Sequence, residues 1–550
     1  MINFITTDFS CSSILKADQV KTPSILCDTN LSGIVEYFNA CKDNDLKPVI
    51  SYFENEIYLA RNQDEYHDLL KRYSRNQVSK QCLHLVGAPF GALANLVTES
   101  YFPYRPADDA FEKAVKHLKD YQKVWDLEVV LAITPYEGEC YEGLRDLLRD
   151  VAKELGLKTC IVDSAHYLDN SKENIADQKI ICGYNTKILL KKYYEMDGNF
   201  RRFFESDQYY IRDWSSFPEY KTTQEIYDSC EEYDILSDPQ LPNIENGMEK
   251  LRDLCREGYK EKELFKRENK QVYIDRIKEE LDIIEESGFA SYFLILYDLC
   301  QWVDSQGWFR GFSRGSAAGC ILLWLTDVTK VDPIEYDLLF NRFYNKDRAE
   351  AKQLPDVDLD IPKTARDGVI KYLNDKYGET CVAKMATYME LQGRSALTTV
   401  MRYNETASFD EIKQITAVLP QKDKVSDELE NVGEKSLIRY VLEYMPDRLS
   451  NYARLEKGKV VGDYADDFEQ AIRLEGTKTQ IGTHASAIIV ADKPIETLAP
   501  LMWDIKGEEK IVGLTLHHGE AAGLLKLDIL GLANLDANKL ALTLVEENAL

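Results

Sequence analysis

Three aspartates in the run LPDVDLDIP carry the clearest chemistry in the sequence. Asp356, Asp358 and Asp360 alternate with aliphatic residues, so a strand over 354–361 would present the three carboxylates on one face. Neighbouring carboxylates repel one another unless a cation lies among them, and hard oxygen ligands suit Mg²⁺. An isolated pattern of this kind is more often a solvated acidic edge strand, so its surroundings decide between the two interpretations.

The segment RGSAAG, upstream of the aspartates, predicts an anion-binding loop before an apolar helix over 317–325. Small residues at Gly315 and Ser316 would let backbone amides approach an anion, and the helix N-terminus would add a favourable dipole. Ser316 would also supply a hydroxyl and Arg314 a positive charge. The alternative is a tight packing turn that leads into a buried helix.

The downstream run GLLKLDILGL predicts a strand with Lys526 and Asp528 on one face and leucines and isoleucine on the other. A single carboxylate on an otherwise apolar strand needs a partner. A metal ion held by the first acidic strand would provide one, and a structural Lys–Asp pair is the alternative. An anion-binding loop with carboxylates on two strands is what nucleotidyl transfer by two metal ions requires.

Several kinds of element must position these residues. Residues 1 to about 180 alternate short β-rich runs with helical stretches, as in a mainly parallel α/β unit or barrel. A helix over 141–157 ends at Gly156, and further helices are expected near 272–288 and 290–304. Residues 387–482 have a helical and more polar pattern, and strands are expected in 481–492 and 523–532.

The composition limits the class of protein. The chain has 550 residues and a net charge of −27, which excludes a wholly basic coating but allows a local basic groove. The 12 cysteines include no C-x-x-C pair, which favours reduced thiols, and no signal peptide or long apolar run is visible. A cytoplasmic protein is therefore expected. Basic runs near the aspartates are more often solvated faces, and no firm role is assigned to them: Arg342, Lys346, Arg348, Lys363, Arg366 and Lys371.

The run SGFASYFLILYDLCQWVDSQGWFRGFSRGSAAG, the aspartate segment LPDVDLDIP and the later runs IGTHASAIIVADKPI and GLLKLDILGLANL closely resemble bacterial replicative DNA polymerases of the C family, the DNA polymerase III alpha subunits. The resemblance covers nearly the whole chain. It implies an α/β multidomain protein with a degenerate PHP-type α/β barrel, a polymerase-β-like α+β palm and a helical thumb inserted in the palm.

The resemblance also implies domain boundaries and residue roles. It gives a PHP-like domain (1–180), a connector (181–250), a first palm segment (251–386), a thumb (387–482) and a second palm segment (483–550). Asp356, Asp358 and Asp528 match the metal-binding catalytic aspartates, with two Mg²⁺ ions expected. Arg314, Gly315, Ser316 and Lys526 match residues that bind the incoming nucleotide, and His484 matches a histidine for which a structural role is expected.

The N-terminal region departs from the metal-binding PHP pattern. The family's His-x-His strand corresponds here to Phe4 and Thr6, and a T-D-H element to Cys27, Asp28 and Thr29. His166 remains, but its acidic neighbour is Ser164. One histidine cannot hold a metal cluster, so a structural PHP domain without bound metal or phosphoesterase activity is expected.

The resemblance implies primer–template DNA and dNTPs as substrates, with a sliding clamp and other replisome proteins as possible partners. In the family a fingers domain follows the D-x-L-G-L strand, and this chain ends soon after it. The expectation is a polymerase whose fingers come from a missing C-terminal part or from a second polypeptide. Two alternatives stay open: a catalytically inactive remnant that binds DNA or replisome proteins, and, less favoured, a PHP phosphoesterase.

Overall fold

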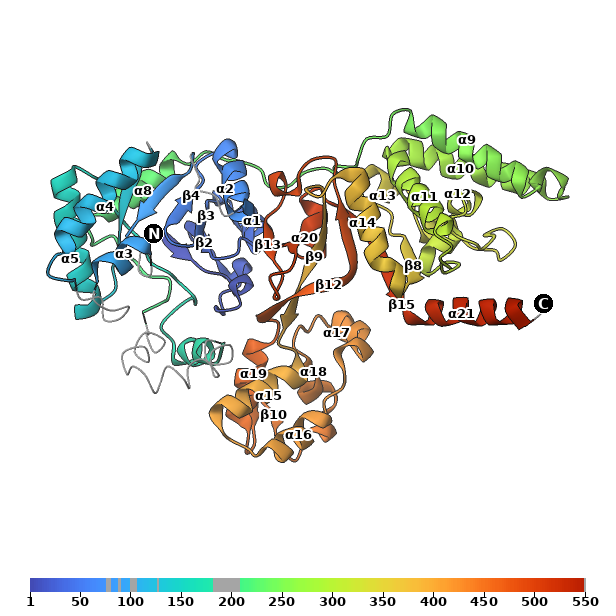
Figure 1. Ribbon diagram of the computed structural model, residues 1–550. Coiled ribbons are helices and arrows are strands. Elements are labelled where there is room, and N and C mark those ends of the chain that lie inside the picture. Colours follow the sequence, from blue (N-terminus) through green and yellow to red (C-terminus); the bar gives the residue numbers. More distant parts are fainter. Residues whose placement is uncertain (76–80, 88–90, 99–105, 126–127, 182–207, 549–550) are drawn as a thin grey trace. The chain divides into compact units, whose positions relative to one another are not determined.

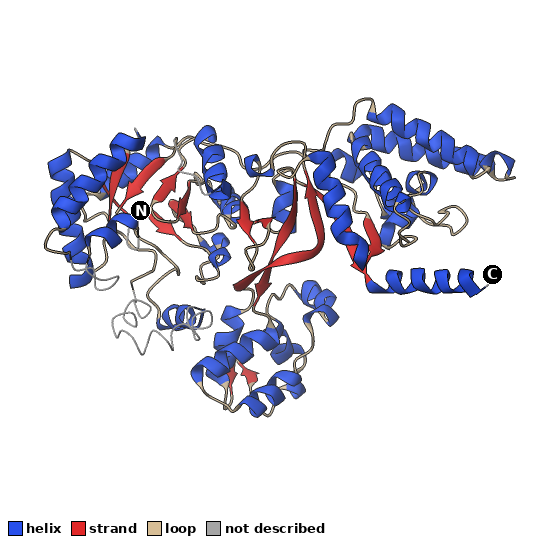
Figure 2. Ribbon diagram, viewed as in Figure 1, coloured by secondary structure: helices blue, strands red, loops and turns tan. Residues whose placement is uncertain are grey.

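The chain divides into two compact units that each combine helices and strands (Figures 1 and 2). The computed structural model describes residues 1–75, 81–87, 91–98, 106–125, 128–181 and 208–548. Unit 1 comprises Met1–Asp234 and Tyr388–Gly482, and unit 2 comprises Ile235–Thr387 and Thr483–Leu550. The predicted α/β, multidomain character is therefore confirmed.

The N-terminal part of unit 1 is built on a curled seven-stranded sheet. Its strands follow one another in sequence order, and neighbours are parallel except that β4 is antiparallel to both β3 and β5. The prediction of a mainly parallel sheet is confirmed, with β4 as the exception. Only three residues separate β4 from β3, too few for a crossover connection. A parallel bridge between Ile5 and Ala165 joins the first strand to the segment after the last. The strands are β1 (Asn3–Ile5), β2 (Ser24–Asp28), β3 (Ile50–Phe53), β4 (Ile57–Leu59), β5 (Leu83–Val86), β6 (Val129–Ile133) and β7 (Thr159–Ile161).

Amphipathic helices pack against this sheet. The helix α5 ends at Gly156 in the left-handed conformation (φ 63°), as the sequence predicts. Of the expected connector, residues 182–207 lie outside the described residues, and the rest includes α8 and the start of α9. The helices are α1 (Ile34–Asp43), α2 (Gln63–Arg75), α3 (Ala92–Val97), α4 (Ala110–Trp125), α5 (Glu139–Leu155) and α8 (Tyr220–Ser229).

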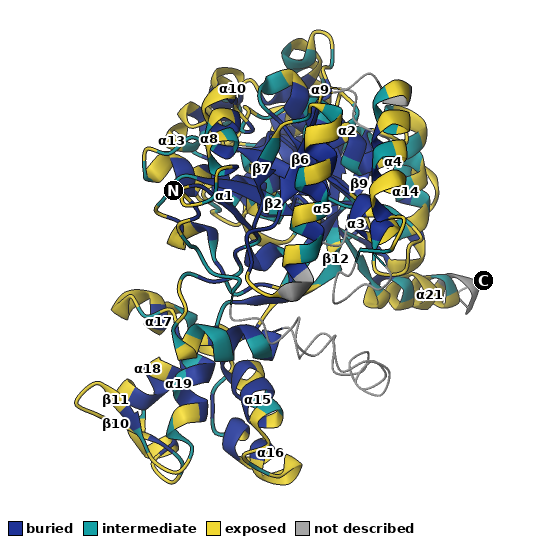
Figure 3. Ribbon diagram, turned by 90° about the vertical axis from the view of Figure 1, so that its left-hand side faces the viewer, coloured by how far each residue is buried: buried dark blue, intermediate teal, exposed yellow. Residues whose placement is uncertain are grey.

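Residues 388–482 form a helical segment of unit 1 with an apolar core that also includes Ile180 and Ile181. Leu397, Ile438 and Phe468 are fully buried there, whereas outward faces of the helices are exposed (Figure 3). The predicted helical character of this stretch is confirmed. Its elements are α15 (Gly393–Asn404), α16 (Phe409–Ala417), α17 (Ser426–Val432), α18 (Leu437–Tyr444), β10 (Arg454–Glu456), β11 (Lys459–Val461) and α19 (Ala465–Leu474).

Unit 2 is built on a six-stranded mixed sheet in the order β13-β14-β9-β12-β15-β8. The strand β15 lies between β12, which is antiparallel to it, and β8, which is parallel to it. The strands are β8 (Asp358–Pro362), β9 (Val382–Glu390), β12 (Lys478–Val490), β13 (Leu501–Trp503), β14 (Lys510–Val512) and β15 (Leu525–Leu532).

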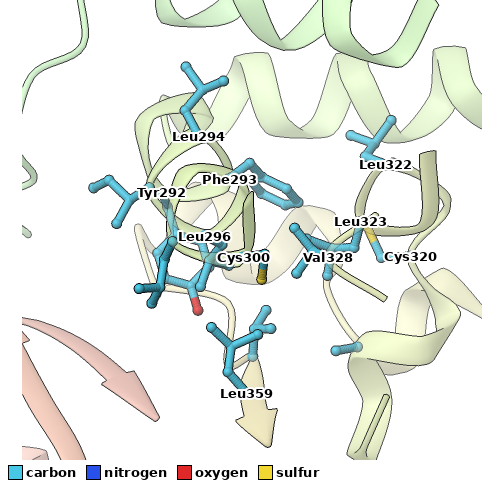
Figure 4. Close-up of a cluster of buried hydrophobic side chains, with 14 of the residues drawn as sticks. Tyr292, Phe293, Leu294, Leu296, Cys300, Cys320, Leu322, Leu323, Val328 and Leu359 are labelled. Carbon is cyan, nitrogen blue, oxygen red and sulfur yellow. The ribbon is translucent and has the colours of Figure 1, made fainter. Parts of the chain in front are cut away.

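The helices of unit 2 supply a large apolar cluster against one face of β8 and β15. Figure 4 shows Leu359 of β8 beside α11 side chains such as Leu296 and Cys300. The helices are α9 (Gly247–Glu261), α10 (Lys270–Ser287), α11 (Ala290–Ser305), α12 (Ile321–Leu325), α13 (Lys346–Glu350), α14 (Arg366–Tyr377), α20 (Leu516–Ala521) and α21 (Ala533–Asn548). None of the helices within the described ranges is both long enough and apolar enough to span a bilayer.

Two predicted elements differ from the structure near the aspartates. The strand expected over 354–361 begins only at Asp358, so Asp356 lies in the segment before β8. The helix expected over 317–325 is a 3₁₀ turn over Gly315–Gly319 followed by the short α12. Both differences arise because the glycines and prolines of these segments favour turns over regular elements.

Candidate active site

Asp358 and Asp528 form the centre of the site. They are register partners on the parallel strands β8 and β15, so their carboxylates project from the same face of the sheet. On β15 the side chains of Leu525, Leu527 and Ile529 are buried in the apolar cluster, whereas Asp528 is only partly buried. The predicted alternation on this strand is confirmed, and the apolar face fixes the direction of its carboxylate.

Lys526 connects the third aspartate to this pair. Its Nζ lies 2.9 Å from Oδ2 of Asp528 and 3.4 Å from Oδ1 of Asp356. Glu520 of α20 approaches the same ammonium, with Oε1 at 3.9 Å. Although burial disfavours the ammonium, these carboxylates outweigh it and raise the pKa of Lys526. The sequence pattern did not identify Glu520, because it comes from a short helix without an acidic motif.

Arg314 forms ion pairs with two further carboxylates of the cluster. Its Nη2 lies 2.9 Å from Oδ1 of Asp358, and its Nε lies 3.5 Å from Oδ1 of Asp360. Burial raises the pKa of Asp358, the positive charge of Arg314 opposes this, and the charges of neighbouring aspartates add to it. Counting Asp356, Asp360, Asp528 and Glu520 with Asp358, five carboxylates pair with two cations, so the cluster keeps a net negative charge.

The loop of Arg314, Gly315 and Ser316 adjoins the carboxylates, and all three residues are exposed. Gly315 has a φ of +64°, and a Cβ placed on it would lie 3.6 Å from Oδ2 of Asp358. Side-chain-bearing residues adopt this left-handed conformation only at a cost, so glycine is favoured in the turn. The structure thus brings the predicted loop and the predicted aspartates together.

The helix that follows this loop does not offer its N-terminus to a ligand. The buried carboxylate of Glu280 accepts the amides of Ile321 and Leu322, the first residues of α12. Arg276 donates from Nε to Glu280 Oε1 at 2.7 Å, and burial raises the pKa of Glu280 to about 7. The predicted contribution of the helix dipole to anion binding is therefore wrong, and the 3₁₀ turn with Arg314 and Ser316 remains.

His484 and Ser486 lie on β12 beside the aspartate pair. Nδ1 of His484 accepts the amides of Ser486 at 3.3 Å and Ala487 at 3.0 Å. Burial lowers the pKa of His484, and the negative charge of Asp528 opposes this effect. Ser486 Oγ lies 3.4 Å from Oδ1 of Asp528. These contacts support a structural role for His484 and reveal Ser486 as a neighbour of the site that the sequence pattern did not indicate.

Two of the basic residues near the aspartates have different surroundings. Arg348 donates to the carbonyls of Phe343 and Leu354 and so supports the local backbone. Arg366, at the start of α14, has buried Nε and Nη2 atoms without a hydrogen-bond partner among the described residues. A guanidinium in this state is open to an anionic ligand, since burying it unpaired is costly.

The carboxylate cluster has the donor chemistry of a magnesium site. Its potential ligands are carboxylate oxygens with excess negative charge, which a hard divalent cation prefers. Within the described ranges, no three His, Cys, Asp or Glu side chains are arranged around a common position for a metal ion. The carboxylates instead contact Lys526 and Arg314. The residue types therefore fit Mg²⁺, with these two cations as the present charge partners.

The residues at the positions expected to match PHP metal ligands form hydrogen bonds within unit 1. Thr6 Oγ1 lies 3.3 Å from Ser164 Oγ, which lies 3.0 Å from Nε2 of His166. Burial lowers the pKa of His166 to about 4. Asp28 accepts both the amide and the hydroxyl of Thr7, and burial raises its pKa to about 7. Phe4 is buried and contributes no polar side chain.

Comparisons with known proteins match these features to one family. The family model described as "Bacterial DNA polymerase III alpha NTPase domain" matches residues 249–531, which include the aspartates, Lys526 and the Gly315–Ser316 loop. The DNA polymerase III subunit alpha of Saccharopolyspora erythraea is 30% identical over 465 residues, covering 80% of this chain and 36% of that protein.

Two further relatives cover more of the chain. The DNA polymerase III subunit alpha of Halalkalibacterium halodurans is 28% identical over 551 residues, and that of Borreliella burgdorferi is 27% identical over 570 residues. Each alignment covers 94% of this chain and 46% of the relative. The chain thus spans less than half the length of the curated relatives it matches. By its family-model match and these relatives, the chain belongs to the bacterial DNA polymerase III alpha family.

Proposed function

We propose that this chain carries the catalytic portion of a replicative DNA-directed DNA polymerase, which adds dNMP from a dNTP to a primer 3′-hydroxyl. The observation that carries the proposal is the register pairing of Asp358 with Asp528. Lys526 contacts both Asp528 and Asp356 and so brings the third aspartate to this pair. These carboxylates adjoin the Gly315 turn, within the family-matched region of the chain. Carboxylates beside an exposed, partly basic loop are suited to a triphosphate with its metal ions.

In this proposal Asp356, Asp358 and Asp528 hold two Mg²⁺ ions. When bound, such ions activate the attacking hydroxyl and neutralise charge on the triphosphate and leaving pyrophosphate. Arg314 and Lys526 would bind phosphate oxygens, since both are cations already placed beside the carboxylates. Ser316 would add a hydroxyl donor, and Gly315 would let the backbone approach the phosphates.

The domain assignment belongs to the same proposal. Residues 251–386 and 483–550 would form the palm, residues 387–482 the thumb, residues 1–180 a PHP-like domain and residues 181–250 the connector. The apolar core of 388–482 is separate from the cluster around β8 and β15, which supports a thumb distinct from the palm. The hydroxyl and imidazole contacts of Thr6, Ser164 and His166 support a PHP-like domain that binds no metal.

The remaining portions of the enzyme would come from outside these residues. Since the relatives are more than twice as long as the matched region, we propose that a fingers domain is supplied by a longer chain or by a second polypeptide. Sliding clamp and other replisome proteins are the expected partners, in the cytoplasm. The mass of the native protein, with identification of what co-purifies, distinguishes a longer chain from a two-chain polymerase.

The direct test is primer extension with Mg²⁺, using the chain with and without the protein that co-purifies. The parent should extend a primer in at least one of these forms. Asp356→Ala should not extend it. The control Asp375→Ala, on the exposed face of α14, should extend the primer as the parent does. A parent that binds primer–template DNA but never extends it would instead support the inactive, DNA-binding alternative. Equal extension by the parent and Asp356→Ala would contradict the proposed site.

A further inference from the structure

A basic pocket lies in the helical segment 388–482, apart from the carboxylate cluster. Its volume is about 580 Å³. It is bordered by the end of α16, the stretch that leads to α17, and the residues after α18. Three cationic side chains line it, and all three are exposed: Arg394, Lys424 and Arg448. The remaining lining is uncharged: Ala417, Leu419, Pro420, Gln421, Val425 and Met445.

Within the described part of the chain, the two arginines donate hydrogen bonds to neutral carbonyl groups only. Nε of Arg394 donates to the carbonyl of Leu419 at 2.8 Å, and Nη1 of Arg448 donates to the carbonyl of Val418 at 3.4 Å. These bonds satisfy carbonyls at the end of α16 and orient the guanidinium groups. They leave the positive charges without a counter-ion, and further N–H groups remain on each arginine.

Carboxylates do not neutralise the pocket. Among the described residues, none of Arg394, Lys424 and Arg448 forms a salt bridge, although acidic residues such as Asp423 and Asp447 are their sequence neighbours. Three unpaired cations that border one open pocket create a locally positive potential and attract an anion with several oxygen acceptors.

We propose that this pocket binds phosphate groups, held by Arg394, Lys424 and Arg448. Planar guanidinium groups match phosphate oxygens geometrically, and the lysine adds a mobile point charge. Two sources share this chemistry: backbone phosphates of duplex DNA and free pyrophosphate. The DNA source rests on the proposed polymerase function, whereas the pyrophosphate source does not.

The test compares the full chain with Lys424→Gln/Arg448→Gln and with the control Lys422→Gln. Lys422 belongs to the same 3₁₀ turn as Lys424 but does not line the pocket. Arg394 is left intact because its bonds support the end of α16. Binding of a fluorescent primer–template duplex is measured between about 50 and 200 mM salt, without Mg²⁺ or dNTP. Pyrophosphate binding is measured separately by calorimetry, and thermal unfolding checks that each variant is folded.

If DNA phosphates occupy the pocket, the double variant should bind the duplex several-fold more weakly than the parent. The slope of log affinity against log salt concentration should be smaller by about 1 to 2. Lys422→Gln should keep the affinity and the slope of the parent. If free pyrophosphate is the ligand, the double variant should lose pyrophosphate binding and keep the duplex affinity of the parent. Folded variants that bind both ligands as the parent does would overturn the proposal. A parent that binds no duplex at all would count against the polymerase function, and pyrophosphate binding would still decide the pocket.

Discussion

Asp358 and Asp528 lie side by side as register partners on two parallel strands that are far apart in the sequence. Each is flanked on its strand by aliphatic residues packed into the same apolar cluster. This arrangement sets the separation and direction of two carboxylates by backbone pairing and core packing, before any ligand binds. It is the structural basis for the proposed metal-binding function.

The turn at Gly315 should be needed for activity more than for stability. Gly315→Ala places a Cβ in the left-handed region, at a cost of about 1–2 kcal/mol, and next to Asp358. Gly433→Ala is the matched control, since Gly433 has a φ of +68° with nothing near its Cβ position. Both variants should lose similar thermal stability, but only Gly315→Ala should lose primer extension. Equal extension by the two variants would show that the turn does not serve the site.

Lys526 should set the acid limit of activity. Burial raises the pKa of Glu520, and Lys526 is the main group that opposes this. In Lys526→Gln the pKa of Glu520 rises further, and the cluster takes up a proton at higher pH. Protonation of Glu520 removes a negative charge from the cluster that contains the proposed ligands Asp356 and Asp528. Mg²⁺ is then held more weakly, so the acid limb of the pH profile of primer extension, at subsaturating Mg²⁺, should move to higher pH. Lys526→Arg keeps the charge and should keep the acid limb of the parent; identical limbs in Gln and Arg variants would refute this role.

Buried carboxyl groups in unit 1 should make the protein less stable as the pH rises. Burial raises the pKa of Asp28 from 3.8 to about 7, so the folded state holds a proton that the unfolded state has lost. The stability contribution is present below the unfolded pKa and decreases between about pH 4 and pH 7, by up to about 1.4 kcal/mol per pH unit for one group. Asp163 and Glu56 act in the same direction.

The variant Asp28→Asn tests this directly, because it removes the titration and retains polar contacts to Thr7. The urea midpoint of Asp28→Asn should fall less steeply with pH than that of the parent. The difference in slope should correspond to one proton fewer released on unfolding. Asp120→Asn, at an exposed position of the same unit, should leave the slope unchanged. A slope as steep in Asp28→Asn as in the parent would mean that Asp28 is ionised in the folded state throughout.

Much of the site could be predicted from local sequence because its periodicity is local. The aliphatic residues Leu525, Leu527 and Ile529 at every second position of β15 indicate the face of Lys526 and Asp528. The helix-ending glycines Gly156 and Gly288 lie where the sequence predicts them. The strand containing Asp356 was predicted too long, since alternation alone does not reveal where pairing begins.

Features that depend on tertiary contacts could not be predicted in this way. Glu280 caps α12 from a different helix, so the residues around the loop carry no indication that those amides are occupied. Glu520 and Ser486 reach the site from separate elements. The basic pocket combines residues from three separate stretches, and none of these stretches is a basic run.

The most direct test of the central claim is Mg²⁺-dependent primer extension by Asp358→Asn, Asp528→Asn and the double variant, with Asp375→Asn as control. Each single variant should lose at least about 100-fold in rate, and the double variant should lose little more, because residues that act as one unit are not additive. Duplex binding should remain in all of them. Extension at the rate of the parent by Asp358→Asn or Asp528→Asn would contradict the account.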